Sequence, residues 1–269
     1  MKYSPISLII LISISFYACQ DDEGASPTTE TAVVEAYLFA GKLIDTVKIS
    51  QSLSYSSSDS LISTLDDLEV FVSDDINSVQ LDFIGNGTYQ NLDLRIQNGQ
   101  SYSLEFEYNE RLITADTYVP DQKKVTASTD EITMDKIESG TFPDFSNLPD
   151  PIELEWENPE GDYYYVVVEN TEEDPETINE LFEDFGIAFN FTSDPEIMDF
   201  YAINPRREIQ QFGRHRIIVF RVNPEYAALY ETSGTTSTTI AEPPSNVDNG
   251  LGLFTGVSSD TLWLNVKKG

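Results

Sequence analysis

The sequence predicts a mainly β protein built of two consecutive β-sandwich domains, the second with a small helical insertion. Three observations support this fold class. Apolar and polar residues alternate with a period of two along most of the chain, as in strands with one face in a core. Turn residues such as Asn98-Gly99 separate these segments, and helical periodicity is limited to two short stretches. The composition, 40% hydrophobic and 12% aromatic, supplies enough apolar side chains for two cores.

The first residues predict export and lipidation. The apolar run from Ile6 to Tyr17 is shorter than the roughly 20 residues that cross a bilayer, and a small residue, Ala18, follows it, as in a secretory signal. Cleavage after Ala18 leaves the chain's only cysteine, Cys19, at the new N-terminus, and residues 16–19 loosely resemble a bacterial lipobox. We therefore expect a lipoprotein signal peptide over residues 1–18 and a lipid anchor on Cys19. The alternative is an ordinary signal peptide with an incidental cysteine.

Residues 19–30 predict a flexible tether. Acidic residues at 21–23 precede a stretch rich in serine, threonine and proline, a composition that cannot bury a core. The acidic cluster behind the cysteine resembles the surface-export signal of Bacteroidetes lipoproteins. We therefore expect an anchor in the outer membrane that faces the cell exterior, with a periplasm-facing acidic linker as the alternative.

Residues 31–120 predict an immunoglobulin-like sandwich. Short alternating segments are bounded by turn residues, among them Asn98-Gly99, a strong hairpin signal because both positions tolerate positive φ. No helical pattern interrupts them, which favours the sandwich over a mixed fold. The expected strands cover residues 32–39, 43–50, 68–73, 78–84, 88–96, 101–108 and 112–119.

Residues 121–269 predict a second sandwich. A strand over 124–134 precedes an irregular stretch over 139–151, and strand alternation then places Ile152, Leu154 and Trp156 on one face. A turn at 158–161 leads to an almost wholly apolar strand over 163–168, which must be buried on both faces or covered by a neighbouring element. This strand pair resembles the second and third strands of fibronectin type III domains. Further strands are expected over 215–222 and 261–266.

Two helices are expected in this second half. Asp174 and Pro175 provide an N-cap and a first-turn proline, and apolar residues follow at helical spacing up to Gly186. Asn223 and Pro224 start a second helix of the same design. The first helix lies in the helical insertion expected at about 171–212.

The formal net charge of −32, from 15 Lys+Arg and 47 Asp+Glu, restricts the function. Nucleic acids, bare anionic lipids and phosphorylated substrates would all be repelled by such a chain. A single cysteine and a single histidine exclude intrachain disulfides, thiolate clusters and multi-histidine metal sites. We expect no cofactor and no catalytic residues. The many carboxylates leave a carboxylate-based secreted hydrolase as an alternative, but spacing alone singles out no acid/base pair.

The positive charges are unevenly distributed. No lysine or arginine occurs between Lys136 and Arg206, and five arginines then follow closely. They either neutralise the acidic face of the strand at 152–157 as cross-strand pairs, or form a contact patch for an acidic loop of a partner. These residues are Arg206, Arg207, Arg214, Arg216 and Arg221.

The segment 241–256 carries a proline followed by Asn-apolar-x-Asn-Gly-x-Gly-apolar-Phe, which includes Asn246, Gly250, Gly252 and Phe254. The glycine spacing differs from a dinucleotide fingerprint, and we expect the glycines to form a close-packed loop before the last strand. The segment resembles the closing motif of the DUF4249 family, lipoproteins of Bacteroidetes. Residues 33–38 and 115–120 match the opening of that family and the end of its first half.

The resemblance implies a role at the outer membrane, because members of the family are often encoded beside TonB-dependent receptors. The family has no established activity. The expected function is therefore a non-enzymatic surface lipoprotein that assists a TonB-dependent receptor in nutrient capture or uptake. The alternative is a structural, adhesin-like or outer-membrane assembly role.

Overall fold

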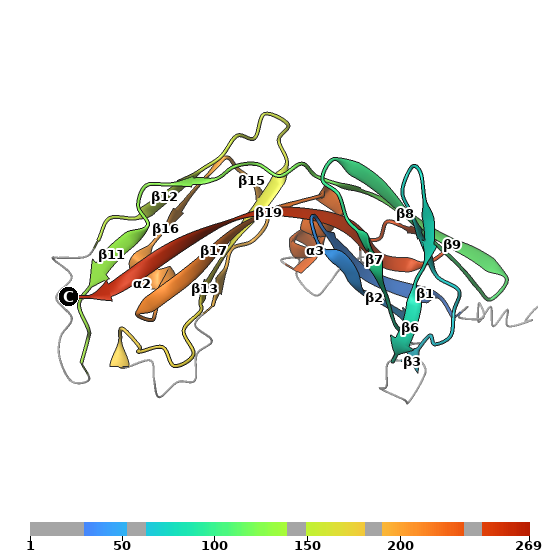
Figure 1. Ribbon diagram of the computed structural model, residues 1–269, viewed down its shortest axis with the longest axis horizontal. Coiled ribbons are helices and arrows are strands. Elements are labelled where there is room, and N and C mark those ends of the chain that lie inside the picture. The colour runs from blue at the N-terminus through green and yellow to red at the C-terminus, as the bar shows by residue number, and fades with distance from the viewer. Residues whose placement is uncertain (1–29, 53–62, 139–148, 181–189, 234–243) are drawn as a thin grey trace, which may run out of the picture.

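The computed structural model describes residues 30–52, 63–138, 149–180, 190–233 and 244–269. The expected signal peptide, Cys19 and all of the tether except residue 30 lie outside these residues. The described chain forms two lobes that meet at an angle, so the molecule has the shape of an arch (Figure 1). In this described part, no helix is long and apolar enough to span a membrane.

One 11-stranded sheet, here called the main sheet, runs through both lobes (Figure 1). Three short strands pair at its sides, namely β11 (Glu131–Met134), β15 (Glu196–Ile197) and β3 (Ser63–Thr64). Its principal strands, in spatial order, are β14 (Phe191–Thr192), β13 (Tyr163–Asn170), β17 (Gly213–Val222), β19 (Leu251–Lys268), β1 (Ala32–Phe39), β2 (Leu43–Gln51), β7 (Thr88–Arg95) and β6 (Asp82–Gly85).

A smaller sheet packs on the main sheet in each lobe, and the two lobes are therefore β-sandwiches, as predicted. The small sheet of the N-terminal lobe contains β18 (Val247–Asp248), β9 (Arg111–Val119), β8 (Gln100–Tyr108), β4 (Phe71–Ser73) and β5 (Ser78–Gln80). That of the C-terminal lobe contains β10 (Thr126–Ala127), β12 (Ile152–Glu155) and β16 (Phe200–Ile203). Among the described residues, the α-helices are α2 (Pro205–Glu208) and α3 (Pro224–Ser233), and α3 lies on the inner side of the arch (Figure 1).

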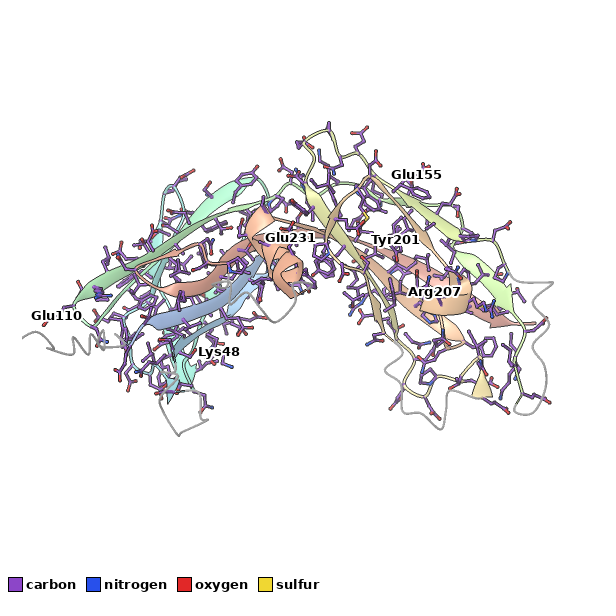
Figure 2. All side chains as sticks on the ribbon, turned by 180° about the vertical axis from the view of Figure 1, so that it is seen from behind. Lys48, Glu110, Glu155, Tyr201, Arg207 and Glu231 are labelled. Carbon is purple, nitrogen blue, oxygen red and sulfur yellow. The ribbon has the colours of Figure 1, made fainter. Side chains whose placement is uncertain are left out.

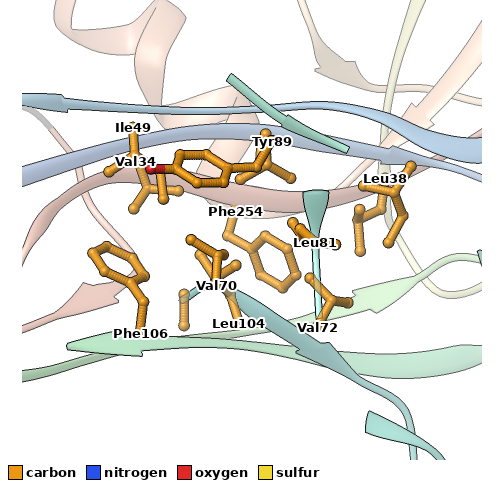
Figure 3. Close-up of a cluster of buried hydrophobic side chains, with 14 of the residues drawn as sticks. Val34, Leu38, Ile49, Val70, Val72, Leu81, Tyr89, Leu104, Phe106 and Phe254 are labelled. Carbon is orange, nitrogen blue, oxygen red and sulfur yellow. The ribbon is translucent and has the colours of Figure 1, made fainter. Parts of the chain in front are cut away.

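Each lobe has its own hydrophobic core between its two sheets. In the N-terminal lobe, side chains of the main sheet meet those of the small sheet around the fully buried Phe254 (Figure 3). In the C-terminal lobe, Trp156 packs against Tyr164 with ring centroids 5.1 Å apart, among aliphatic side chains of β12, β13 and β17. The separate cores explain the two lobes.

The strand β19 belongs to both lobes. Residues 251–257 pair in parallel with β1, the first strand of the chain, and residues 257–266 pair antiparallel with β17. Val257 is the shared point, because it is the register partner of Phe39 on one side and of Val222 on the other. At about 3.3 Å per residue, the 18 residues of β19 extend over roughly 60 Å, which spans the arch.

Three expectations for the C-terminal segment are therefore corrected. The last strand begins at Leu251 and not at residue 261, so Gly252 and Phe254 of the motif lie within a strand instead of a loop, and Gly250 directly precedes that strand. The N-terminal lobe does not end at residue 120, because β18 pairs with β9 and the first part of β19 pairs with β1. The open edge of β1 accepts a strand from the other end of the chain, a long-range pairing that no local pattern encodes.

Two predicted strands are each divided between sheets. The segment 78–84 forms β5 in the small sheet and then β6 in the main sheet, with the buried Leu81 at the crossing. The segment 124–134 likewise forms β10, which pairs with β12, and β11, which pairs with β19. A strand that changes sheet keeps its period-two pattern, so alternation alone does not reveal the break.

The helical insertion is also corrected. Residues 174–179 do not form the start of a helix, because Thr177 bridges to Gln211 and Asn179 bridges to Ile137, while Ile178 is buried in the second core. These β-bridges outweigh the local capping signal. Residues 181–186 of the predicted helix lie outside the described residues. The described part of 171–212 contains β14, β15, β16 and the four-residue helix α2.

Candidate functional site

Asn246 of the family motif connects two strands of the N-terminal lobe. Its side-chain amide donates hydrogen bonds to the carbonyl oxygens of Asp116, at 3.2 Å, and Phe254, at 2.7 Å. Its side-chain oxygen accepts a hydrogen bond from the backbone N–H of Phe254 at 3.0 Å. One side chain thereby joins β9 to β19, which gives this motif residue a structural role.

The motif glycines allow β19 to pass close to its neighbours. Gly252 has φ +103°, and a Cβ there would overlap the carbonyl oxygen of Val34 on β1. A Cβ on Gly256 would overlap the carbonyl oxygen of Tyr118 on β9. A Cβ on Gly250 would lie 2.8 Å from a side-chain carbon of Val247. The motif therefore seats β19 in the N-terminal lobe, and no ligand contact is needed to explain it.

Asparagine side chains close the outer edge of β9. Asn249, Asn246 and Asn223 donate to the carbonyl oxygens of Leu112, Asp116 and Tyr118 at 2.9, 3.2 and 2.8 Å. Between them, the two-residue strand β18 pairs with residues 114–115. A capped edge of this kind does not offer free backbone groups to another strand, which protects against edge-to-edge aggregation.

The two lobes meet at a hydrogen-bonded joint around Asn223, just before α3. The Asn223 amide donates to Thr117 Oγ1 at 3.1 Å and to Thr255 Oγ1 at 3.4 Å. Thr255 in turn donates to the Glu225 carboxylate at 3.0 Å, and Thr117 accepts the backbone N–H of Gly256 at 2.8 Å. Strands β9 and β19 and helix α3 are thus tied together, mostly by buried groups, which favours a stiff joint.

Arg221 completes the joint from the C-terminal lobe. Its side chain is only 9% exposed, forms an ion pair with Asp162, and donates to the backbone carbonyl of Asp121 at 2.9 Å. Asp121 lies in the segment that leads from β9 into the C-terminal lobe. A buried arginine whose partner is removed leaves an uncompensated charge, so this contact fixes the position of the linker.

The five arginines do not form one patch. Arg221 is buried, and Arg206 and Arg207 lie on α2, where Figure 2 shows Arg207 beside Tyr201. On β17, Arg214 and Arg216 point to one face of the sheet and Arg221 points to the other. The alternative that they neutralise the acidic strand is also wrong, because β12 pairs with β10 and β16 and not with β17. Arg216 pairs instead with Glu169.

The inner face of the arch is defined here as the surface of the main sheet turned away from the small sheets. Aromatic rings cluster on it beside the joint: Tyr165 stacks on Phe220 at 4.7 Å and on Tyr226 of α3 at 5.6 Å. Tyr37 of β1 contacts Tyr226 edge-on at 6.0 Å, so the cluster connects both lobes. Burial raises the pKa of Tyr37, Tyr165 and Tyr226, which keeps these hydroxyls neutral at physiological pH.

The same face carries an exposed tryptophan at its far end in the C-terminal lobe. Trp263 is 44% exposed, and the Arg214 guanidinium lies 3.7 Å from the centre of its ring. Trp263 was not among the site residues predicted from the sequence. Its outward orientation could have been predicted from strand alternation. Trp263 lies between Leu262 and Leu264, which face the core, and must therefore point away from it.

Carboxylates and metal ligands do not converge in the part of the chain that the structure describes. No group of three or more histidine, cysteine, aspartate or glutamate side chains there could hold a metal ion. Burial raises the pKa of Glu208, whose neighbour is Tyr201. The small sheet of the N-terminal lobe has a polar depression of about 540 Å³, lined by Phe71, Ser73, Ser78, Ser103, Leu104, Glu105, Thr114 and Asp116. Hydrated polar groups are the ordinary covering of a sandwich face.

The only histidine, His215, is buried in the C-terminal lobe, at 2% exposed. Its Nδ1–H donates to the carbonyl of Gly213 at 3.2 Å, and its Nε2 faces the Asn170 amide at 3.4 Å. That amide also donates to the carbonyl of Phe212, so Nε2 is the acceptor and the ring is neutral. Burial lowers the pKa of His215, opposed by the Gly213 hydrogen bond and by Glu172.

We expect acid to destabilise the protein through this group. Between the lowered folded pKa and the unfolded value near 6.5, the unfolded chain binds a proton that the folded chain does not, so the free energy of unfolding rises with pH in that window. The slope is at most about 1.4 kcal/mol per pH unit for one group. Urea unfolding of the wild type and His215→Gln from pH 5 to 7.5 measures it. The variant keeps every carboxylate, and equal slopes in the two proteins would contradict the prediction.

The fold and these contacts define a class of protein: a two-lobed β-sandwich protein whose lobes share one strand. The family model "Domain of unknown function (DUF4249)" matches residues 21–262, and the chain belongs to this family. A comparison with curated proteins finds no match.

Solved structures with sandwich domains are similar over much of the chain. A two-domain fibronectin type III segment of chicken tenascin matches with 8% identity and a TM-score of 0.26, covering 88% of this chain and 99% of that one. Titin domains A168–A170 match with 11% identity and a TM-score of 0.21, over 88% and 68%. Escherichia coli alpha-2-macroglobulin activated by porcine elastase matches with 9% identity and a TM-score of 0.23, over 85% and 22%.

Proposed function

We propose that this protein is a lipid-anchored lipoprotein of a Bacteroidetes outer membrane that faces the cell exterior. In this proposal it docks on a TonB-dependent receptor, performs no chemistry itself, and helps the receptor capture or admit a nutrient. The leader followed by Cys19 and the acidic tether support the proposed location in the outer membrane. The family resemblance supports the proposed interaction with a TonB-dependent receptor.

The observation that carries the docking role is the shared strand β19. It pairs with β1 in one lobe and with β17 in the other, and the Asn223 and Arg221 contacts brace the joint. An inner face held in one shape pays little conformational entropy on binding, which favours a surface used for docking. Its aromatic and arginine side chains are types that interfaces favour.

Mild detergent extraction of cells that carry the full-length chain tests this function. We expect the wild type to remain with the outer membrane and to co-purify with a β-barrel receptor. Cys19→Ser should release the protein from the membrane, because it removes the site of acylation. Isolation of the wild type without any β-barrel partner would count against the docking role. An unmodified Cys19 in mass spectrometry would count against the proposed lipid-anchored location.

A structural or outer-membrane assembly role is the competing proposal. The extended arch supports it, because two lobes held together by a shared strand also suit a spacer. Deletion of the protein distinguishes the two. Uptake predicts a growth defect on particular nutrients only, whereas an assembly role predicts a general envelope defect such as sensitivity to detergents.

A further inference from the structure

The far end of the inner face is an apolar surface with two arginines. It is called here the Trp263 patch and consists of outward-facing residues on three adjacent strands. In register, Glu169, Arg216 and Trp263 form one row of the sheet, and Val167, Ile218 and Thr261 form the next. Arg214 covers one face of the Trp263 ring. The patch is made of Val167, Arg214, Arg216, Ile218, Thr261 and Trp263.

The outward face of a sandwich sheet is usually polar, whereas this one combines charged side chains with Trp263, Ile218 and Val167. Trp263 is 44% exposed, and Val167 and Ile218 are half-buried although they point away from the core. An exposed tryptophan beside arginines on a rigid sheet has the composition of an interaction hot spot. Residues 163–168 were predicted to be buried on both faces or covered by a neighbouring element, yet Val167 on this face of β13 is only half-buried among the described residues.

At the other end of the same face, beside the joint, the main sheet is covered by helix α3. There α3 places Tyr226 on Tyr165, with ring centroids 5.6 Å apart and planes 17° from parallel. Tyr165 and Val167 are neighbours on the same face of β13. An occupant of the Trp263 patch would continue this packing beyond the reach of α3, with apolar or aromatic side chains.

The charges indicate what else the occupant brings. Arg216 already has a partner, Glu169. For Arg214, no carboxylate oxygen among the described residues lies within 4.0 Å of the guanidinium, and its contact is the Trp263 ring. The rows of the patch carry two arginines, Arg214 and Arg216, against the one carboxylate of Glu169, although the chain as a whole has 47 acidic and 15 basic residues. A carboxylate of the occupant would complete its hydrogen bonding.

We propose that the Trp263 patch docks an acidic segment of a partner protein, which sets an aspartate or glutamate against Arg214 and a nearby apolar or aromatic side chain against Trp263 and Ile218. This inference rests on the proposed docking function and names the surface that performs it.

Photocrosslinking in cells locates the partner. A benzoylphenylalanine residue replaces Thr261, which is exposed within the patch, and in a control it replaces Glu107, which is exposed on β8 of the other lobe. We expect a crosslinked partner from position 261 and not from position 107. Mass spectrometry then identifies the crosslinked peptide, and that peptide is synthesised as the probe for binding measurements on the purified mature chain.

Charge reversal then tests the contact. Arg214→Glu should weaken binding of the probe peptide by roughly ten-fold or more, the size of a hot-spot loss, and Trp263→Ser by a similar factor. Arg111→Glu is the matched control, because Arg111 is an exposed strand arginine of the N-terminal lobe, and it should change the affinity less than two-fold. Replacing the acidic residue of the peptide with arginine should restore binding to Arg214→Glu.

The outcomes separate this inference from the proposed function. If the wild type co-purifies with a β-barrel receptor but position 261 yields no adduct, or an adduct within this chain, the patch is not the docking surface and the receptor proposal stands. If the adduct is an acidic segment of a protein that is not a β-barrel, the patch is confirmed and the receptor proposal fails. A peptide without a carboxylate, or unchanged affinity in Arg214→Glu, overturns the inference.

Discussion

Phe254→Ala should lower the free energy of unfolding by about 3–5 kcal/mol, the range for truncating a buried phenylalanine. Phe254 is completely buried at the centre of the N-terminal core, between the main sheet and the small sheet (Figure 3). Removing the ring leaves a cavity between Leu104 and the aliphatic side chains of β1, and two braced sheets have little freedom to close it. Urea unfolding followed by circular dichroism measures the loss.

The same variant tests whether the lobes unfold together. Both tryptophans, Trp156 and Trp263, belong to the C-terminal lobe, so tryptophan fluorescence reports that lobe alone. Because β19 is common to both lobes, we expect the fluorescence transition of Phe254→Ala to move to lower urea together with the circular dichroism transition. Phe200→Ala, at a side chain that is 43% exposed on β16, is the matched control and should cost about 1 kcal/mol or less. An unchanged fluorescence midpoint in Phe254→Ala would contradict the coupling.

Gly252→Ala should destabilise the protein by roughly 2–5 kcal/mol, from the strain of a positive φ and from overpacking. Gly252 has φ +103°, and the added Cβ would meet the backbone of Val34, which cannot move without disturbing the pairing of β1 with both β19 and β2. The clash is with backbone and not with the end of a flexible side chain, so it displaces a strand.

Gly161→Ala separates the two causes. Gly161 also has a positive φ, +74°, but a Cβ there would meet nothing within 4 Å. This control should cost about 1 kcal/mol, the conformational term alone. If Gly252→Ala proves no more destabilising than Gly161→Ala, the close approach of β19 to β1 is wrong. If Gly252→Ala fails to accumulate as a folded protein while Gly161→Ala folds, expression and circular dichroism support the close approach of β19 to β1.

Local patterns predicted the strands of the N-terminal lobe well. The segment expected at 32–39 coincides with β1, and those expected at 88–96, 101–108 and 112–119 differ from the observed strands by at most one residue at either end. Alternation is reliable there because each of these strands has one face in a core, as Val34, Ala36 and Leu38 show. The helix α3 was also predicted correctly from Asn223 and Pro224.

Long-range pairing decided what local patterns missed. The glycines at 250–256 suppress strand propensity, yet β19 starts among them because their lack of a side chain lets it pass β1 and β9. At Thr177 the bridge to Gln211 likewise outweighs a good capping signal. Both errors have one cause: the partner segment lies far away in sequence, and a single sequence carries no record of it.

The candidate site was predictable only in part. The arginine cluster directed attention to β17, but strand parity separates Arg221, which faces inward, from Arg214 and Arg216, which face outward. Parity was available from the neighbouring Ile217 and Val219. The stacking of Arg214 on Trp263 was not, because it depends on the register between β17 and β19.

The central claim is that β19 and the joint hold both lobes in one fixed arrangement. Glu107 on β8 and Glu153 on β12 are both exposed, and each is replaced by a spin-labelled cysteine in a Cys19→Ser background. Pulsed electron–electron double resonance then measures the distance between the two lobes. Cys19 is the only native cysteine, so labelling is confined to the introduced sites. The shared strand predicts a single narrow distance distribution, unchanged by moderate salt. A broad or two-peaked distribution would show that the lobes move independently and would remove the basis for a preformed docking face.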